Sequence, residues 1–112
     1  MVEIKRVMAE AYCELVIEGS IDASSSIHLE NSLEQVILEG NSVLLINMSG
    51  LTYISSAGLG AFISKLDIIN QRDIQMIFFQ LSPAVASVFE ILGLGDLLDI
   101  VADKETAIGK IK

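Results

Sequence analysis

Two adjacent serines, Ser55 and Ser56, lie in the segment of this sequence with the best-defined chemistry, residues 53–60. The segment follows an apolar run and precedes a helical pattern, so we expect both serines where a helix begins, at the carboxyl end of a strand. The first turn of a helix has backbone N–H groups without intrahelical partners and the positive end of the helix dipole. A serine phosphate of about −1.5 to −2 charges is locally favoured there. The pattern is therefore compatible with a serine that another protein modifies.

Gly58 and Gly60 follow the serines directly. Because glycine has no side chain, both would keep the surface low and let a partner protein approach the backbone closely. A plainer interpretation remains open. A serine before a helix often serves only as its cap, and glycines at a helix start often serve close internal packing. The residues alone favour this cap interpretation.

Residue patterns of common enzyme sites are missing from the chain. His28, the single histidine, lies among polar neighbours on a predicted helix, which favours a solvated side chain over a catalytic one. No nucleophile elbow of the form Gly-x-Ser-x-Gly is present, and Lys65 is not placed as in a phosphate-binding loop. The acidic residues lack metal-ligand spacing, so we expect no metal and no cofactor. Four of them are interpreted as solvated: Glu14, Glu18, Glu30 and Glu34.

Length and composition predict one soluble domain over residues 1–112. Hydrophobic residues make up 52% and charged residues 20%, which argues against a disordered chain. Fifteen acidic side chains against seven basic ones give a net charge of −8, which argues against nucleic acid and anionic membrane as partners. Cys13 is the only cysteine and cannot form an internal disulfide. Its place on an apolar strand face predicts an inert, buried thiol.

The apolar runs are too short for membrane insertion, since a spanning helix needs about 20 apolar residues. The densest runs cover residues 43–46 and 77–79, and the first residues lack the apolar core of a signal peptide. We therefore expect a cytoplasmic protein. Its apolar excess is compatible with a homodimer.

The first part of the chain predicts two strands and a helix. Residues 2–8 and 11–18 are expected to be strands, the second with Cys13, Leu15 and Ile17 on one face. Asp22 or one of the following serines caps a helix that Gly40 ends. The buried face of this helix is expected to consist of Leu29, Leu33, Val36 and Ile37.

The rest of the chain alternates strand and helix. The expected elements, in order, are a central strand 43–48, a loop 49–54, a helix of about 57–71, a strand 74–80, a helix from Ser82 to Gly93, a short strand near 98–101 and a helix from about Asp103. The expected buried faces of the two longer helices are Leu59, Phe62, Ile63, Leu66 and Ile69, and then Val85, Val88, Phe89 and Leu92. The order β-β-α-β-α-β-α-β-α predicts an α/β fold with a largely parallel sheet. Antiparallel pairing of the first two strands would make that sheet mixed.

Residues 45–60 resemble the signature of STAS domains, specifically of the bacterial anti-sigma factor antagonists. In that family a buried strand ends in Asp-x-Ser, and a Tyr-x-Asp-Ser-x-Gly-Leu-Gly stretch opens a helix. Residues 19–23 are similar to the family's Gly-x-x-Asp loop, and residues 81–83 and 92–94 match its later helix. The likeness covers nearly the whole chain and implies the family's mixed sheet with helices packed against it.

The resemblance also implies a phosphorylation-controlled interaction switch rather than an enzyme. The unphosphorylated domain binds an anti-sigma factor that is a serine kinase, and this frees a sigma factor for transcription. The kinase then phosphorylates a serine at the helix start, binding is lost, and a metal-dependent serine phosphatase reverses the change. By position, Ser56 is the phosphoacceptor. The implied partner-binding residues are Asp22, Ser55, Ala57, Gly58, Leu59 and Gly60.

This sequence departs from the family pattern at two positions. Ser55 stands where the family usually has Asp before the acceptor, and Asn47 replaces the aspartate at the strand end. Losing both carboxylates removes negative charge beside the acceptor, which would alter kinase recognition, make Ser55 a competing acceptor, or leave a binding surface without a switch.

Two further functions stay open. STAS-like proteins also serve as accessory subunits of lipid-transporting ABC complexes or of signalling assemblies, where binding is constitutive. A small nucleotide-binding enzyme would use the Ser-Gly loop, but no Lys or Arg lies between Met48 and Ser64 to meet phosphates.

Overall fold

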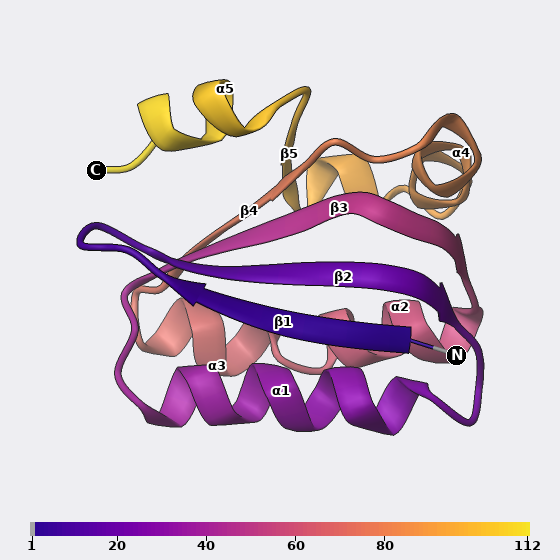
Figure 1. The fold of residues 1–112 in the computed structure, drawn as a ribbon, viewed down its shortest axis with the longest axis horizontal. Helices are drawn as coiled ribbons and strands as arrows, with labels where there is room; N and C mark the ends of the chain where they lie inside the picture. The colour runs from indigo at the N-terminus through magenta and orange to yellow at the C-terminus, as the bar shows by residue number, and fades with distance from the viewer. Residues whose placement is uncertain (1) are drawn as a thin grey trace.

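The computed structural model describes residues 2–112, and these form one five-stranded sheet whose strands lie in chain order (Figure 1). The strands are β1 (Val2–Met8), β2 (Cys13–Ile21), β3 (Val43–Ile54), β4 (Gln75–Phe79) and β5 (Asp99–Val101). β1 pairs antiparallel with β2, and every later neighbour pairs in parallel. The predicted mixed α/β sheet is therefore confirmed.

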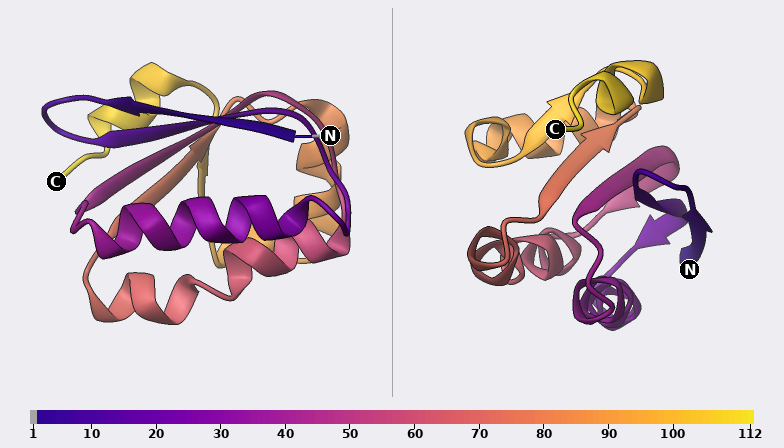
Figure 2. Two further views of the ribbon diagram at one scale, coloured as in Figure 1. Left: turned by 60° about the horizontal axis from the view of Figure 1, so that its bottom comes forward. Right: turned by 90° about the vertical axis from the view of Figure 1, so that its left-hand side faces the viewer.

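Helices cover the two faces of the sheet unequally (Figure 2). The helices are α1 (Ser26–Leu38), α2 (Ser56–Ile63), α3 (Leu66–Gln71), α4 (Pro83–Ile91), the 3₁₀ helix η1 (Leu94–Asp96) and α5 (Lys104–Gly109). Side chains of α1 to α4 share the larger core with one sheet face. On the other face, Ala107 of α5 packs in a smaller core with Leu45 and Phe79. No helix within residues 2–112 is long and apolar enough to cross a membrane.

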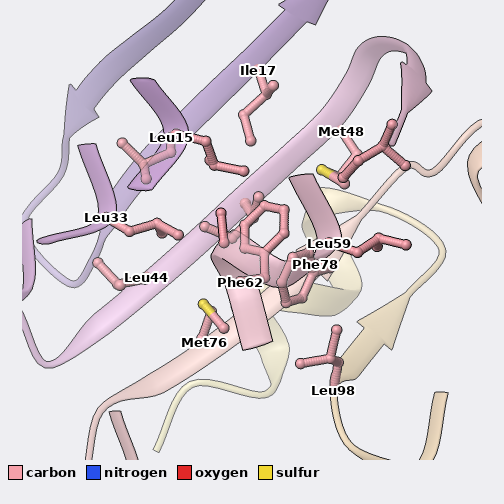
Figure 3. Close-up of a cluster of buried hydrophobic side chains, with 14 of the residues drawn as sticks. Leu15, Ile17, Leu33, Leu44, Met48, Leu59, Phe62, Met76, Phe78 and Leu98 are labelled. Atoms are coloured by element: carbon pink, nitrogen blue, oxygen red, sulfur yellow. The ribbon is translucent and has the colours of Figure 1, made fainter. Parts of the chain in front are cut away.

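The larger core follows the predicted strand and helix faces closely. Cys13 is fully buried, and burial raises the pKa of its thiol. Leu15 and Ile17 of β2 meet Leu33 of α1 and Phe62 of α2 over the middle of the sheet (Figure 3). The Phe62 and Phe78 rings meet edge to face with centroids 4.9 Å apart. Such ring pairs add roughly 0.5–1.5 kcal/mol beyond the area they bury.

Helix ends agree with the sequence signals. Gly40 has φ +86° and Gly93 has φ +71°, so both end their helices in the left-handed conformation that glycine adopts without strain. The Ser82 hydroxyl accepts from the Val85 N–H, and Pro83 fills the first turn of α4. Asp103 caps α5 through the Thr106 N–H.

The expected loop over residues 49–54 is wrong, because β3 continues to Ile54. This part of β3 pairs in parallel with the end of β2, matching Gly19 with Leu51 and Ile21 with Ile54. Two register shifts interrupt the pairing, which gives the strand an irregular pattern that does not alternate.

The single helix expected over 57–71 is also wrong, because the chain forms α2 and α3 with a turn at Ser64 and Lys65. The Lys65 N–H donates to the Phe62 oxygen three residues back, and the Ser64 hydroxyl donates to the Ala61 oxygen. This tighter bonding changes the helix direction. Ile63, the last residue of α2, is 42% exposed instead of buried. The expected burial of Leu92 is wrong too, because it follows the end of α4 and is exposed.

Candidate functional site

The start of α2 is held against the ends of β2 and β3. The Ser55 N–H donates to the Ile21 oxygen at 2.8 Å, which continues the parallel pairing one residue beyond Ile54. The chain then turns into the helix at Ser55, which has extended backbone angles and is the N-cap of α2. Its Oγ accepts from the Gly58 N–H at 3.1 Å. Ser55 thus performs the capping role that the plainer interpretation assigned to it.

Ser56 is the first residue of α2 and is exposed. In residues 2–112 its hydroxyl has no hydrogen-bond partner, so it is free to meet another molecule. Among the backbone N–H groups of the first helical turn, which have no intrahelical partner, the Ser55 side chain binds the one at Gly58. The two candidate hydroxyls therefore differ, since one is engaged in the fold and the other is available.

Gly58 and Leu59 lie in the core, which corrects the expectation that they form a surface for a partner. A Cβ on Gly58 would lie 2.7 Å from Ile21 Cγ2 and 2.8 Å from Ile54 Cγ1, so only glycine lets α2 approach the strand ends this closely. Leu59 is 2% exposed. Both residues position the start of α2 from within the core.

Gly60 is exposed, and a Cβ there would meet nothing within 4 Å. Ala57 is exposed beside it, and Tyr53, at 55% exposure, precedes the turn on β3. The surface around the Ser56 hydroxyl is therefore low and partly apolar.

Asp22 follows Ile21 directly, so the loop that it begins adjoins the start of α2. Its Oδ1 accepts from the Ser24 hydroxyl at 2.8 Å, and from the backbone N–H and the hydroxyl of Ser25, both at 2.9 Å. These bonds lower the pKa of this exposed carboxyl to about 2, and the bond from Ser24 contributes most. Asp22 stabilises a turn before α1 rather than capping the helix, and it keeps a negative charge beside the site at any physiological pH.

A buried polar cluster lies on the sheet face that α5 covers, and the sequence patterns did not predict it. Glu14, predicted to be solvated, is 3% exposed. Its carboxylate accepts from Asn47 Nδ2 at 3.0 Å and pairs with Lys104 Nζ at 2.7 Å. Lys104 also lies 5.7 Å from the centre of the Tyr12 ring, and the Glu14 carboxylate raises the pKa of this lysine. The sequence signal for this burial is weak: it consists of the apolar Ala107 and Ile111 near the end of the chain, which pack in the smaller core on this sheet face.

The site combines an exposed hydroxyl at a helix start with exposed small residues beside it. His28 is exposed on α1, as expected. Across residues 2–112, no group of three or more His, Cys, Asp or Glu side chains is placed to hold a metal ion.

Comparison with known proteins gives consistent matches. The STAS domain family profile matches residues 2–107. An anti-sigma-B factor antagonist of Listeria monocytogenes is 30% identical over 89 residues, which cover 80% of this chain and 78% of that protein. A crystal structure of an anti-sigma factor antagonist from Mycobacterium paratuberculosis superimposes with a TM-score of 0.91 at 15% identity, covering 99% of this chain and 94% of the other. The Bacillus cell fate determinant SpoIIAA in its phosphorylated form has a TM-score of 0.71 at 21% identity, covering 98% and 100%.

Proposed function

Because this chain belongs to the STAS domain family, we propose that it is an anti-sigma factor antagonist whose binding is switched by phosphorylation of Ser56. Unphosphorylated, it binds an anti-sigma factor that is also a serine kinase, and so releases a sigma factor for transcription. Phosphorylation by that kinase ends the binding, and a serine phosphatase restores it. The name of the Listeria relative and the phosphorylated form of SpoIIAA support this role.

One observation carries the assignment of the acceptor: the exposed, unbonded hydroxyl of Ser56 at the first position of α2. Transfer of the ATP γ-phosphoryl group needs a nucleophilic oxygen that can enter the kinase site in line with the leaving group. The Ser55 oxygen accepts the Gly58 N–H, and its backbone is tied to Ile21. Ser55 is therefore the alternative acceptor only if the first turn of α2 opens.

The same position explains how the modification blocks binding. A phosphate on Ser56 places about −1.5 to −2 charges on a surface beside Asp22, in a chain of net charge −8. A partner that buries this surface must desolvate the phosphate, and residues 49–63 contribute no Lys or Arg to pair with it. The uncompensated charge costs on the order of several kcal/mol, which weakens a complex more than a hundredfold.

The decisive experiment incubates the full chain with its cognate anti-sigma kinase and ATP and locates the phosphate by mass spectrometry. We expect phosphate on Ser56 in the parent and in Ser55→Ala, and none in Ser56→Ala. Calorimetry should find tight binding for the parent and Ser56→Ala, and much weaker binding for Ser56→Asp. Phosphate at neither serine would overturn the switch. Unchanged binding of Ser56→Asp would instead favour a constitutive subunit of a transporter or signalling assembly.

A further inference from the structure

Large apolar side chains are exposed together where α4 ends and η1 begins. Ile91 is 80% exposed, Leu92 53% and Leu97 65%. These three lie within seven residues, and Ile91 is the most exposed large hydrophobic side chain in the described part of the chain. Several large apolar side chains exposed within one short segment are typical of interaction sites, because exposing apolar surface to water is unfavourable.

A hollow of about 350 Å³ lies among the neighbouring residues. Phe89 is almost fully buried and contributes to its floor, and the partly buried Leu81, Ala86 and Ile100 line it. Gly93 and Gly95 also line the hollow and add no side chain to it, and the space beside each is open, since a Cβ on either would meet nothing within 4 Å. The hollow lies at the small end of the range for ligand pockets and suits a few inserted side chains.

The lining of the hollow includes acidic side chains and no basic one. Glu90 and Asp96 contribute to its lining, and residues 73–103 contain no Lys or Arg. The next two lysines are already paired, Lys104 with the buried Glu14 and Lys110 with Asp99. The hollow is therefore lined by two carboxylates and by no basic side chain, which favours a cationic partner over an anionic one.

We propose that this α4–η1 surface, defined by Glu90, Ile91, Leu92, Asp96, Leu97 and the hollow beside them, docks a basic amphipathic helix of a partner protein. Apolar side chains at i, i+3/i+4 and i+7 enter the hollow, while flanking Lys or Arg side chains pair with Glu90 and Asp96. A partner strand has little to pair with, because β5 at this sheet edge is three residues long. A second copy is disfavoured, because it would bring the same acidic rim and a net charge of −8 against this one. The surface is formed by other elements than the Ser56 site, and it extends the proposed function to a second partner contact.

The test titrates the isotope-labelled full chain with a synthetic 18-residue helix of Leu and Lys and follows backbone amide signals by NMR. The matched control peptide keeps the leucines and replaces each Lys by Glu. We expect saturable shifts confined to residues 81–100 with the Lys peptide and none with the Glu peptide. Leu92→Gln with Leu97→Gln should weaken binding on the order of tenfold, as should Glu90→Lys with Asp96→Lys. All four side chains are exposed, so these variants should fold.

A control variant makes the result specific. Ile108→Gln removes a 42% exposed apolar side chain from α5 and should leave the affinity unchanged. Equal binding of both peptides, shifts spread over the acidic surface, or no shifts in residues 81–100 would overturn the proposal. Concentration-dependent shifts at these residues without peptide would overturn it as well, because a second copy would then be the occupant. No kinase is involved, so the result is independent of the Ser56 switch.

Discussion

Asn47 Nδ2 donates a hydrogen bond to Glu14 Oε2 across the β2–β3 pair, at 3.0 Å. Asn47 Oδ1 at the same time accepts from the backbone N–H and the hydroxyl of Ser49. An aspartate, which the family usually has at this strand end, would keep the bonds to Ser49 but place a second carboxylate against the buried Glu14. Asn47 at this position therefore suits the buried Glu14, and its contacts lie on the sheet face that α5 covers rather than at Ser56.

Asn47→Asp should lower the free energy of unfolding by about 1–3 kcal/mol at pH 7, because it replaces a buried hydrogen bond by like-charge repulsion. Repulsion raises the folded-state pKa of one carboxyl, so the loss is largest at neutral pH and shrinks as pH falls toward about 4. Urea unfolding at several pH values measures both effects. Glu14→Gln in the Asn47→Asp background restores a donor between the two side chains and should recover part of the stability. An Asn47→Asp variant as stable as the parent at pH 7 contradicts the role of this pair.

Sequence patterns predicted the order of strands and helices along the chain and most helix ends because those features depend on local signals. Alternation placed Cys13 and Leu15 inward, and Ser82 with Pro83 began a helix. Glu14 could not be placed in this way, because strand alternation assigns it to the second face of β2 and says nothing of what covers that face. The cover is α5, whose Lys104 comes from the other end of the chain.

The extension of β3 to Ile54 was missed for a similar reason. Ser, Gly and Thr in residues 49–54 have loop-like local preferences, and the strand exists because β2 pairs with it. Glycine at position 50 suits this close pairing, because any Cβ there would lie only 2.8 Å from Glu18 Cγ on the neighbouring strand. At the candidate site, the sequence located the serines but not the division of roles between them, which depends on the Ser55 bond to Gly58.

Gly58→Ala and Gly60→Ala form a matched pair within α2. Alanine at Gly58 crowds the buried Ile21 and Ile54. Overpacking of this kind lowers the free energy of unfolding by about 1–3 kcal/mol. The higher helix propensity of alanine offsets up to about 1 kcal/mol of this loss. Alanine at Gly60 meets open space and should stabilise the protein by up to about 1 kcal/mol. Thermal unfolding of both variants measures the difference. Equal stabilities would mean that α2 does not need the close approach at Gly58.

Asp22 should titrate near pH 2, well below the ordinary value of 3.8. Its lowered pKa means that its ionised form stabilises the turn before α1 at every pH above about 4, and that this contribution is lost as pH falls through 2. The side-chain carboxyl signal in NMR reports the titration directly. Ser24→Ala removes the largest cause of the shift and should raise the pKa. Titration of the parent near the ordinary value would contradict the observed turn.

Ser55→Ala and Ser56→Ala should separate the structural serine from the modifiable one. Loss of the Ser55 cap bond leaves the Gly58 N–H without its partner and should cost about 0.5–2 kcal/mol of unfolding free energy. Ser56→Ala removes an exposed hydroxyl that makes no bond within residues 2–112, so the change should stay within about 0.5 kcal/mol. Urea unfolding compares the two variants, and Ser55→Thr, which keeps a capping oxygen, should retain most of the stability. If Ser56→Ala were the more damaging change, the hydroxyl would have a structural partner and could not be the freely accessible acceptor that the switch requires.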